Sequence, residues 1–115
     1  MPDYNQIFDE IGGQIKQLAE NTVSKYRDQA VADANALVAS MKEDLIRWTD
    51  LLANKRIDTK EFEILVNSEK DLVQMKALQT SGLAAIRVQQ FSMSVLNMVV
   101  DVVFTKVLPA AVAVA

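Results

Sequence analysis

The sequence predicts an all-α fold, built as a long antiparallel helical hairpin that assembles into a multi-helix bundle. Two patterns lead to this prediction: an apolar stripe with helical spacing through the N-terminal half, and a broader apolar helix near the C-terminus. A capped turn lies between them. We expect a single domain over residues 1–115, with arm one at about 3–53, a turn at 54–58, arm two at about 59–108 and an apolar tail at 109–115.

Arm one is predicted from its capping residue and its periodicity. Asp3 is placed as an N-cap, with Gln6 three residues later and Pro2 just outside the helix. Apolar or small residues then recur by steps of four, four and three, a repeat of about eleven residues that keeps them on one face. We therefore expect one rod of about 50 residues, roughly 70 Å long. This apolar stripe consists of Tyr4, Phe8, Gly12, Ile15, Ala19, Val23, Tyr26, Ala30, Ala34, Leu37, Met41, Leu45, Trp48 and Leu52.

Small residues in the stripe bear on how the rod packs and where it bends. Ala19, Ala30 and Ala34 permit another helix to approach closely. Gly12 and Gly13 each disfavour a helix by about 1 kcal/mol relative to alanine. The glycine pair is therefore the point where we expect the rod to bend or to release a short leading helix.

Arm one is expected to end at a tight helix–helix turn. Asn54 is predicted to be a left-handed C-cap. Asp58 begins the next helix, because Glu61 stands three residues later and can complete a capping box. Ile57, directly before the cap, is placed to pack on Phe62 as a hydrophobic staple.

The segment Leu51–Phe62 resembles the SHOCT-type helical hairpin, in which an isoleucine and a capping Ser or Thr precede a Glu-Phe pair. Asp58 replaces the capping hydroxyl, Lys55 replaces the family's glycine, and Val66 replaces a later lysine. Such hairpins are often regarded as assembly elements, so the resemblance implies self-association and names no chemistry. Helix capping alone also produces this pattern. The matching positions are Ile57, Glu61 and Phe62.

Arm two carries a seam residue at every seventh position, and its seam is less uniform than the stripe of arm one. Thr80, Ser81 and Gly82 leave open a kink, a close crossing or a break. A break would convert the long hairpin into a compact three-helix bundle, and Pro109 ends the arm. The seam consists of Leu65, Leu72, Gln79, Ile86, Met93, Val100 and Val107.

The segment Val95–Leu108 is apolar around most of its helical circumference, so it must be surrounded by protein or by lipid. We predict that it forms a subunit interface, with contact to lipid as the alternative. A β-strand is a minor alternative that its valines suggest. The residues predicted for this interface are Val95, Met98, Val99, Val102, Val103, Phe104 and Leu108.

A narrow polar line runs along the same helix by steps of three or four residues. We interpret it as the one solvent-exposed edge of a helix buried in a bundle. The alternative is a face toward a shared lumen or a neighbouring subunit. Asp101 and Lys106 would each cost about 2.5–3.5 kcal/mol near a bilayer centre, so we do not predict a transmembrane helix. The polar line consists of Arg87, Gln90, Ser94, Asn97, Asp101 and Thr105.

The residue types exclude most catalytic chemistry. The chain has no histidine and no cysteine, which removes the usual zinc ligands, imidazole bases and thiolate nucleophiles. The acidic clusters at 9–10, 43–44 and 58–63 are typical of the solvated faces of helices. Only three glycines occur, and no phosphate-binding loop. We expect no enzymatic activity, no cofactor and no bound metal.

The charge distribution argues against a nucleic-acid partner. The net charge is −3, with nine acidic and seven basic residues up to Arg56 and six and five after it. No apolar signal core follows the start, so we expect no Sec-type signal peptide and take the cytoplasm as the default location. We predict a non-enzymatic structural or interaction protein that self-associates into an oligomer, ring or filament, without a small-molecule substrate. The alternative is a membrane-active or membrane-attached helical protein whose C-terminal segment inserts into lipid as an oligomer.

Overall fold

The first helix begins where its capping residue predicts. The Asp3 carboxylate accepts a hydrogen bond from the backbone N–H of Gln6 at 3.1 Å. The computed structural model describes residues 3–69 and 75–108, and every regular element in these two ranges is helical. The all-α prediction is therefore confirmed. The elements are α1 (Tyr4–Val23), η1 (Ser24–Tyr26), α2 (Arg27–Ser40), α3 (Lys42–Ala53), α4 (Thr59–Asn67), α5 (Lys76–Ser81) and α6 (Ala85–Val107).

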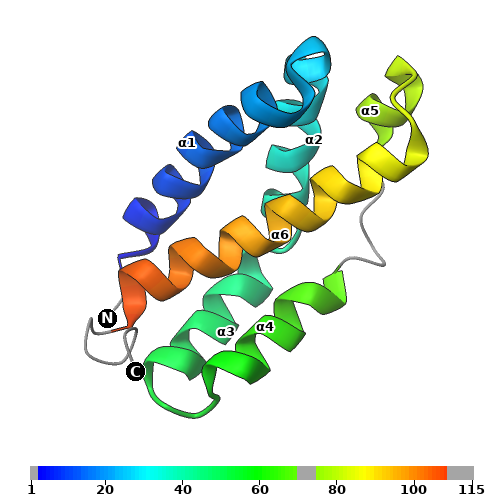
Figure 1. Ribbon diagram of the computed structural model, residues 1–115. Coiled ribbons are helices and arrows are strands. Elements are labelled where there is room, and N and C mark those ends of the chain that lie inside the picture. The colour runs from blue at the N-terminus through cyan, green and yellow to red at the C-terminus, as the bar shows by residue number, and fades with distance from the viewer. Residues whose placement is uncertain (1–2, 70–74, 109–115) are drawn as a thin grey trace.

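The predicted long antiparallel hairpin is not confirmed. The molecule measures 43 × 24 × 24 Å, too short for a straight rod of about 50 residues, which would need roughly 70 Å. Arm one instead folds back at the short 3₁₀ segment η1, so that α1 and α2 lie against each other (Figure 1). The backbone leaves the helical region at Val23 (φ −139°, ψ 46°) and at Tyr26 (φ −117°, ψ 28°).

Small side chains permit this close crossing of α1 and α2. Ala19, Ala30 and Ala34 are completely buried, as the close approach of two helices requires. Gly12 and Gly13 do not bend the chain, because α1 runs through both without interruption. A second break occurs at Met41, where α2 ends and α3 begins.

Arm two is divided into α4, α5 and α6. Gly82 adopts the left-handed conformation (φ 97°) and ends α5, which is one of the outcomes that the sequence left open. Met75, just before α5, is also left-handed (φ 41°). The predicted seam residue Leu72 and the predicted tail 109–115 lie outside the described residues.

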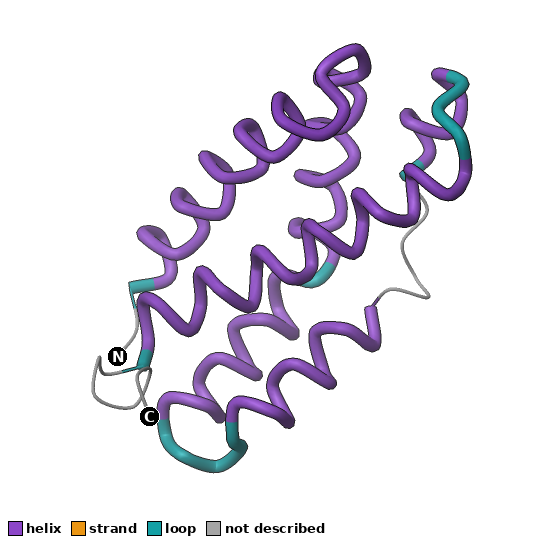
Figure 2. Tube along the Cα trace, viewed as in Figure 1, coloured by secondary structure: helices purple, strands orange, loops and turns teal. Residues whose placement is uncertain are grey.

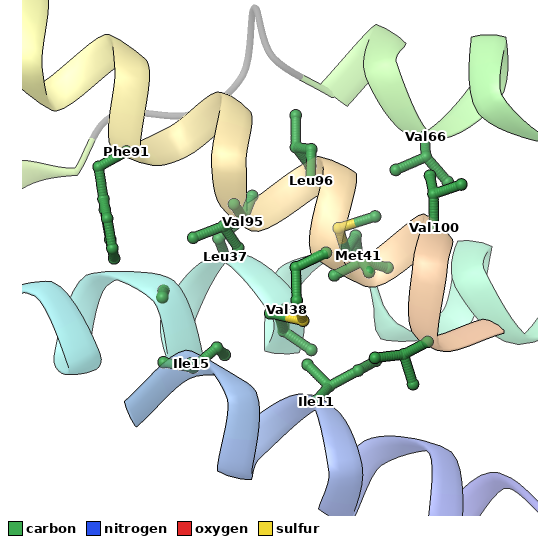
Figure 3. Packing of buried hydrophobic residues seen from close by; sticks show 14 of the residues in the cluster. Ile11, Ile15, Leu37, Val38, Met41, Val66, Phe91, Val95, Leu96 and Val100 are labelled. Carbon is green, nitrogen blue, oxygen red and sulfur yellow. The ribbon is translucent and has the colours of Figure 1, made fainter. Parts of the chain in front are cut away.

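Helix α6 occupies the centre of the fold. It runs antiparallel to α1 and contacts α1, α3, α4 and α5 (Figure 1). Figure 2 shows that helices make up most of the described trace, with loops confined to the connections. In the interior, Ile11 and Ile15 of α1, Leu37 and Val38 of α2, and Val95 of α6 point toward one another (Figure 3).

Most of the apolar stripe is buried, as predicted. Its members from Ile15 to Leu52 all belong to the core except Tyr26, which is half-buried. In the first turns of α1 the buried face is displaced, because α1 packs against both α2 and α6. Ile7 and Ile11 are buried there, while the stripe residues Tyr4, Phe8 and Gly12 are only half-buried.

Candidate functional site

The residues predicted for the apolar interface lie on α6 and at its end. Five of these seven side chains are at most 9% exposed within the single chain, and Phe104 and Leu108 are half-buried. The protein that surrounds this helix is therefore its own chain. An enclosed side chain can reach a second copy only if the bundle opens, so its role in self-association or lipid contact remains a prediction. The five buried residues are Val95, Met98, Val99, Val102 and Val103.

Phe104 connects α6 to the capped turn. Its ring lies 5.6 Å from the ring of Phe62 between centroids, with the planes tilted by 49°. Tilted aromatic pairs at this separation are favourable. Phe62 is fully buried at the start of α4, so this pair fixes α4 against the C-terminal part of α6.

The polar line forms the exposed edge of α6, as the favoured interpretation predicted. All six residues are exposed except Ser94, which is half-buried. The line follows the antiparallel seam between α6 and α1, because two shallow hollows along this seam each contain members of both helices. Its geometry is that of a solvated edge. The alternative, a face toward a shared lumen or a neighbouring subunit, stays a prediction.

The hollow near the end of α6 is small. Its volume is about 100 Å³, and it is lined by Glu10 and Gln14 of α1 and by Asp101, Val102, Thr105 and Lys106 of α6. Within it, the Thr105 hydroxyl donates to the backbone carbonyl of Asp101 at 2.8 Å. This internal bond satisfies the hydroxyl within its own helix. The hollow has room for water-sized molecules and shows no arrangement of groups directed at a substrate.

The hollow at the opposite end of the seam adjoins the turn between α1 and α2. Its volume is about 380 Å³, and it lies between residues 22–26 and residues 82–84 and 87. Across it, the Arg87 guanidinium donates to the backbone carbonyl of Thr22 at 2.7 Å. Thr22 lies in the last turn of α1, where carbonyls lack intrahelical partners, and a cation is favourable there. Arg87 therefore holds the end of α1 to the start of α6.

The capped turn at 54–58 forms largely as predicted. The Asp58 carboxylate accepts from the Glu61 N–H at 2.7 Å, and the Glu61 carboxylate accepts from the Asp58 N–H at 3.1 Å. The left-handed residue, however, is Lys55 (φ 60°), and Asn54 remains on the right-handed side (φ −90°). The chain needs the left-handed residue one position beyond the C-cap. Ile57 is half-buried against the core.

Backbone bonds around Lys55 complete a Schellman motif. The N–H of Arg56 donates to Leu51 O at 2.8 Å, and the N–H of Lys55 donates to Leu52 O at 3.1 Å. This is the position at which the SHOCT-type pattern has glycine. The turn thus has the conformation that a glycine would favour, which neither establishes nor excludes membership of that family.

Two contacts between distant segments were not predicted. The Tyr4 hydroxyl donates a short hydrogen bond to the Asp50 carboxylate and so ties the start of α1 to α3. Burial, followed by this hydrogen bond and the charge of Asp50, raises the pKa of the Tyr4 hydroxyl above its ordinary value. The Asp33 carboxylate of α2 accepts from backbone N–H groups of α5. No local pattern identifies either contact, since each joins residues more than 40 positions apart.

No family model, curated protein or solved structure matches this chain. The function must therefore be argued from the chain itself. Among the described residues, α6 is the helix with the length and mean hydropathy (1.2) to cross a membrane, and 56% of that window is buried inside the protein. The core helix of a soluble bundle has the same character.

The described residues hold no group of three or more Asp or Glu side chains arranged to bind a metal ion. The acidic clusters at 9–10, 43–44 and 58–63 lie at the surface, where their carboxylates meet solvent or helix ends. The ion pairs in the described ranges are likewise exposed: Arg27 pairs with Glu20 and Asp28, and Arg47 pairs with Asp44.

Proposed function

We propose that this chain is a non-enzymatic interaction protein that self-associates through its long amphipathic helices. One observation carries the proposal: the apolar stripe continues without interruption through residues 4–52, yet a single chain buries it only by folding the helix back at Ser24–Tyr26. A stripe with this continuity can be buried against its own chain or against a second copy. The same apolar stripe could therefore bind a second copy, and self-association would need no additional apolar surface.

The exposed apolar side chains give the proposal additional support. Ile64 on α4 and Ile86 on α6 are 61% and 63% exposed. Single exposed apolar residues are common on monomers, so these two do not define an interface by themselves. They show that the surface presents large aliphatic groups where a partner helix could add burial.

The residue composition favours an interaction role over catalysis. Histidine and cysteine are missing from the whole sequence, and the hollows on the α1–α6 seam are open and bordered by exposed polar groups. A catalytic site usually needs titratable groups brought together in a sheltered pocket. The proposal therefore includes no substrate, cofactor or metal.

The test is the solution mass of the full chain, measured by light scattering in detergent-free buffer from low micromolar to several hundred micromolar protein. We expect a mass that rises to a dimer or a larger oligomer as concentration increases. A chain that keeps the monomer mass over the whole range would contradict the proposal. Electron microscopy of any large species would then distinguish a ring from a filament.

The second candidate function is membrane attachment through α6, and the length and hydropathy of this helix favour it. To enter lipid, α6 would have to leave α1, α3 and α4, since these helices cover its valines. Liposome flotation with neutral and anionic vesicles tests this idea. We would expect the chain to float with the vesicles, and a covalent link between α1 and α6 to prevent it. A chain that stays with the soluble fraction excludes the candidate.

A further inference from the structure

The turn between α1 and α2 has none of the local signals that end α3 and α5. Residues 23–27 read Val-Ser-Lys-Tyr-Arg, with neither glycine nor proline. No side chain caps η1 or the start of α2. By contrast, the turn at 54–58 has a capping box and a Schellman motif, and α5 ends at the left-handed Gly82. The local sequence at Ser24–Tyr26 therefore contains no residue that prevents a continuous helix.

Tertiary contacts hold this turn closed. Five residues of α1 are buried at 4% exposure or less against the rest of the chain: Ile7, Ile11, Ile15, Ala19 and Val23. The two ends of α1 are fixed by polar contacts, the Tyr4 hydroxyl to Asp50 and the Thr22 carbonyl to Arg87. If the turn straightened in an isolated chain, this whole face would meet water. Opening is favourable only when a second copy replaces the lost contacts.

The Arg87 contact is specific to the closed turn. In a continuous helix, the Thr22 carbonyl would accept the N–H of Tyr26, four residues later. In the closed turn this carbonyl instead accepts the Arg87 guanidinium at 2.7 Å. Straightening Ser24–Tyr26 gives the Thr22 carbonyl this intrahelical donor and moves it away from the Arg87 of its own chain. Thr22 and Arg87 act as a latch on the closed form.

We propose that two copies of this chain exchange α1, with Ser24–Tyr26 as the hinge. Each α1 then joins its own α2 as one long helix and packs on the α2 and α6 of the other copy. The core contacts of the closed chain are thereby rebuilt between copies, which is the basis of domain swapping. Short hinges under tertiary constraint favour such exchange. This inference rests on the self-association proposed above and specifies its segment and its surface.

The chain has no native cysteine, so a pair of engineered cysteines can report the exchange directly. Gln14 on α1 and Asp101 on α6 line the same small hollow. Q14C and D101C are prepared as two separate variants, unfolded together, refolded as a mixture and treated with a short bis-maleimide. Exchange predicts a covalent dimer containing one chain of each variant on a denaturing gel. The closed fold predicts no such product, because neither chain carries both cysteines.

The double variant Q14C/D101C distinguishes the exchange of α1 from self-association through a surface. A dimer by light scattering together with cross-links between chains supports exchange. A dimer whose cross-links form only within chains overturns exchange and leaves self-association through a surface intact. A monomer at every concentration, with links within one chain, overturns both. Thermal unfolding of each variant by circular dichroism checks that the helices remain folded.

Hinge variants provide an independent readout. Lys25 is exposed and lies in the middle of η1. K25G weakens a continuous helix relative to K25A, because glycine disfavours a helix by about 1 kcal/mol more than alanine does. This difference changes the equilibrium between straight and closed hinge by roughly five-fold in each chain. Since the dimer contains two hinges, we expect the dimer dissociation constant of K25G to be about 30-fold higher than that of K25A. R87A removes the latch and should shift the distribution toward dimer. Equal dissociation constants for K25G and K25A would overturn the hinge assignment.

Discussion

The carboxylate of Asp33 caps the start of α5 by accepting a hydrogen bond from the backbone N–H of Leu78 at 2.8 Å. It also accepts from the N–H of Ala77 at 3.1 Å. Met75, the N-cap residue of α5, is left-handed and makes no side-chain capping bond. The cap comes instead from α2, more than 40 residues earlier in the chain. One side chain therefore fixes both the position and the start of α5.

Replacing Asp33 should lower the free energy of unfolding by about as much as the loss of a helix N-cap does. We expect D33A to lower the free energy of unfolding by about 1–2 kcal/mol, whereas D33N should recover much of it, because asparagine is also a good N-cap. Urea denaturation measures both. D28A, on the exposed start of the same helix, is the control and should change stability by about 0.5 kcal/mol or less. Equal effects of D33A and D28A would contradict the capping role.

The Tyr4 hydroxyl contact with Asp50 predicts a stability that depends on alkaline pH. Burial and the Asp50 carboxylate raise the pKa of Tyr4, so the folded state holds this proton more tightly than the unfolded state. Its contribution is complete below the ordinary pKa of about 10 and is lost as pH rises above it. Y4F should remove this part of the pH dependence and lower stability at neutral pH by about 1 kcal/mol.

Denaturant unfolding from pH 7 to pH 11 compares wild type with Y4F. Y26F is the control, because Tyr26 is half-buried in the turn and has no hydroxyl contact that corresponds to Asp50. We expect the difference in stability between wild type and Y4F to shrink above pH 10. A constant difference across this range would show that Tyr4 does not titrate differently in the folded chain.

Gly13, one of the two glycines at which the sequence predicted a bend, should be replaceable by alanine. Gly13 lies in the middle of α1, is exposed, and an added Cβ would meet nothing within 4 Å. G13A should therefore raise the free energy of unfolding by about 0.5–1 kcal/mol through helix propensity. Gly82 has equal space but a left-handed φ of 97°, so G82A should lower stability by about 1 kcal/mol. Thermal unfolding of both variants tests these opposite changes in stability. A change in the same direction in G13A and G82A would contradict the prediction.

The features that the sequence predicted are those decided within a few residues. The Asp58–Glu61 capping box depends on a spacing of three, and the exposure of Asn97 and Asp101 depends on the helical period of one element. Both are determined by the helix itself, whichever elements pack around it. For the same reason the all-helical fold class and most of the buried stripe were predictable.

The features that the sequence missed are set by packing between distant segments. The apolar stripe shows which face of arm one is buried. It cannot show whether this face packs against another chain or against the other half of arm one in the same chain. The turn at Ser24–Tyr26 adds no glycine, proline or cap from which to infer it. Periodicity also cannot show that Val99 is buried within its own chain, and a contact of Val99 with a second copy stays a prediction.

The left-handed Lys55 predicts a stabilising substitution. A residue with a Cβ is strained at φ 60°, and glycine is the favoured residue at this position of a Schellman motif. We expect K55G to raise the free energy of unfolding by about 0.5–1 kcal/mol. A53G, in the last turn of α3, is the matched control and should lower it by a similar amount, because its backbone is helical. A loss of stability in K55G would show that Lys55 is not left-handed in solution.

Val99 distinguishes a core residue from an interface residue. Its side chain is completely buried within the single chain, on the central helix α6. V99A removes two methyl groups from a packed interior, so we expect the free energy of unfolding to fall by about 2 kcal/mol. The solution mass at a given protein concentration should not change while the variant is folded, because the cavity is internal.

The control is N97A, two positions away on the exposed polar line, which should alter stability by about 0.5 kcal/mol or less. Urea unfolding and light scattering on both variants provide the comparison. A V99A chain of wild-type stability that had lost its self-association would place Val99 in a subunit contact, as the sequence pattern first indicated. The expected result, lower stability with an unchanged mass, instead assigns Val99 to a core that the closed chain forms and that the exchange of α1 would rebuild between copies.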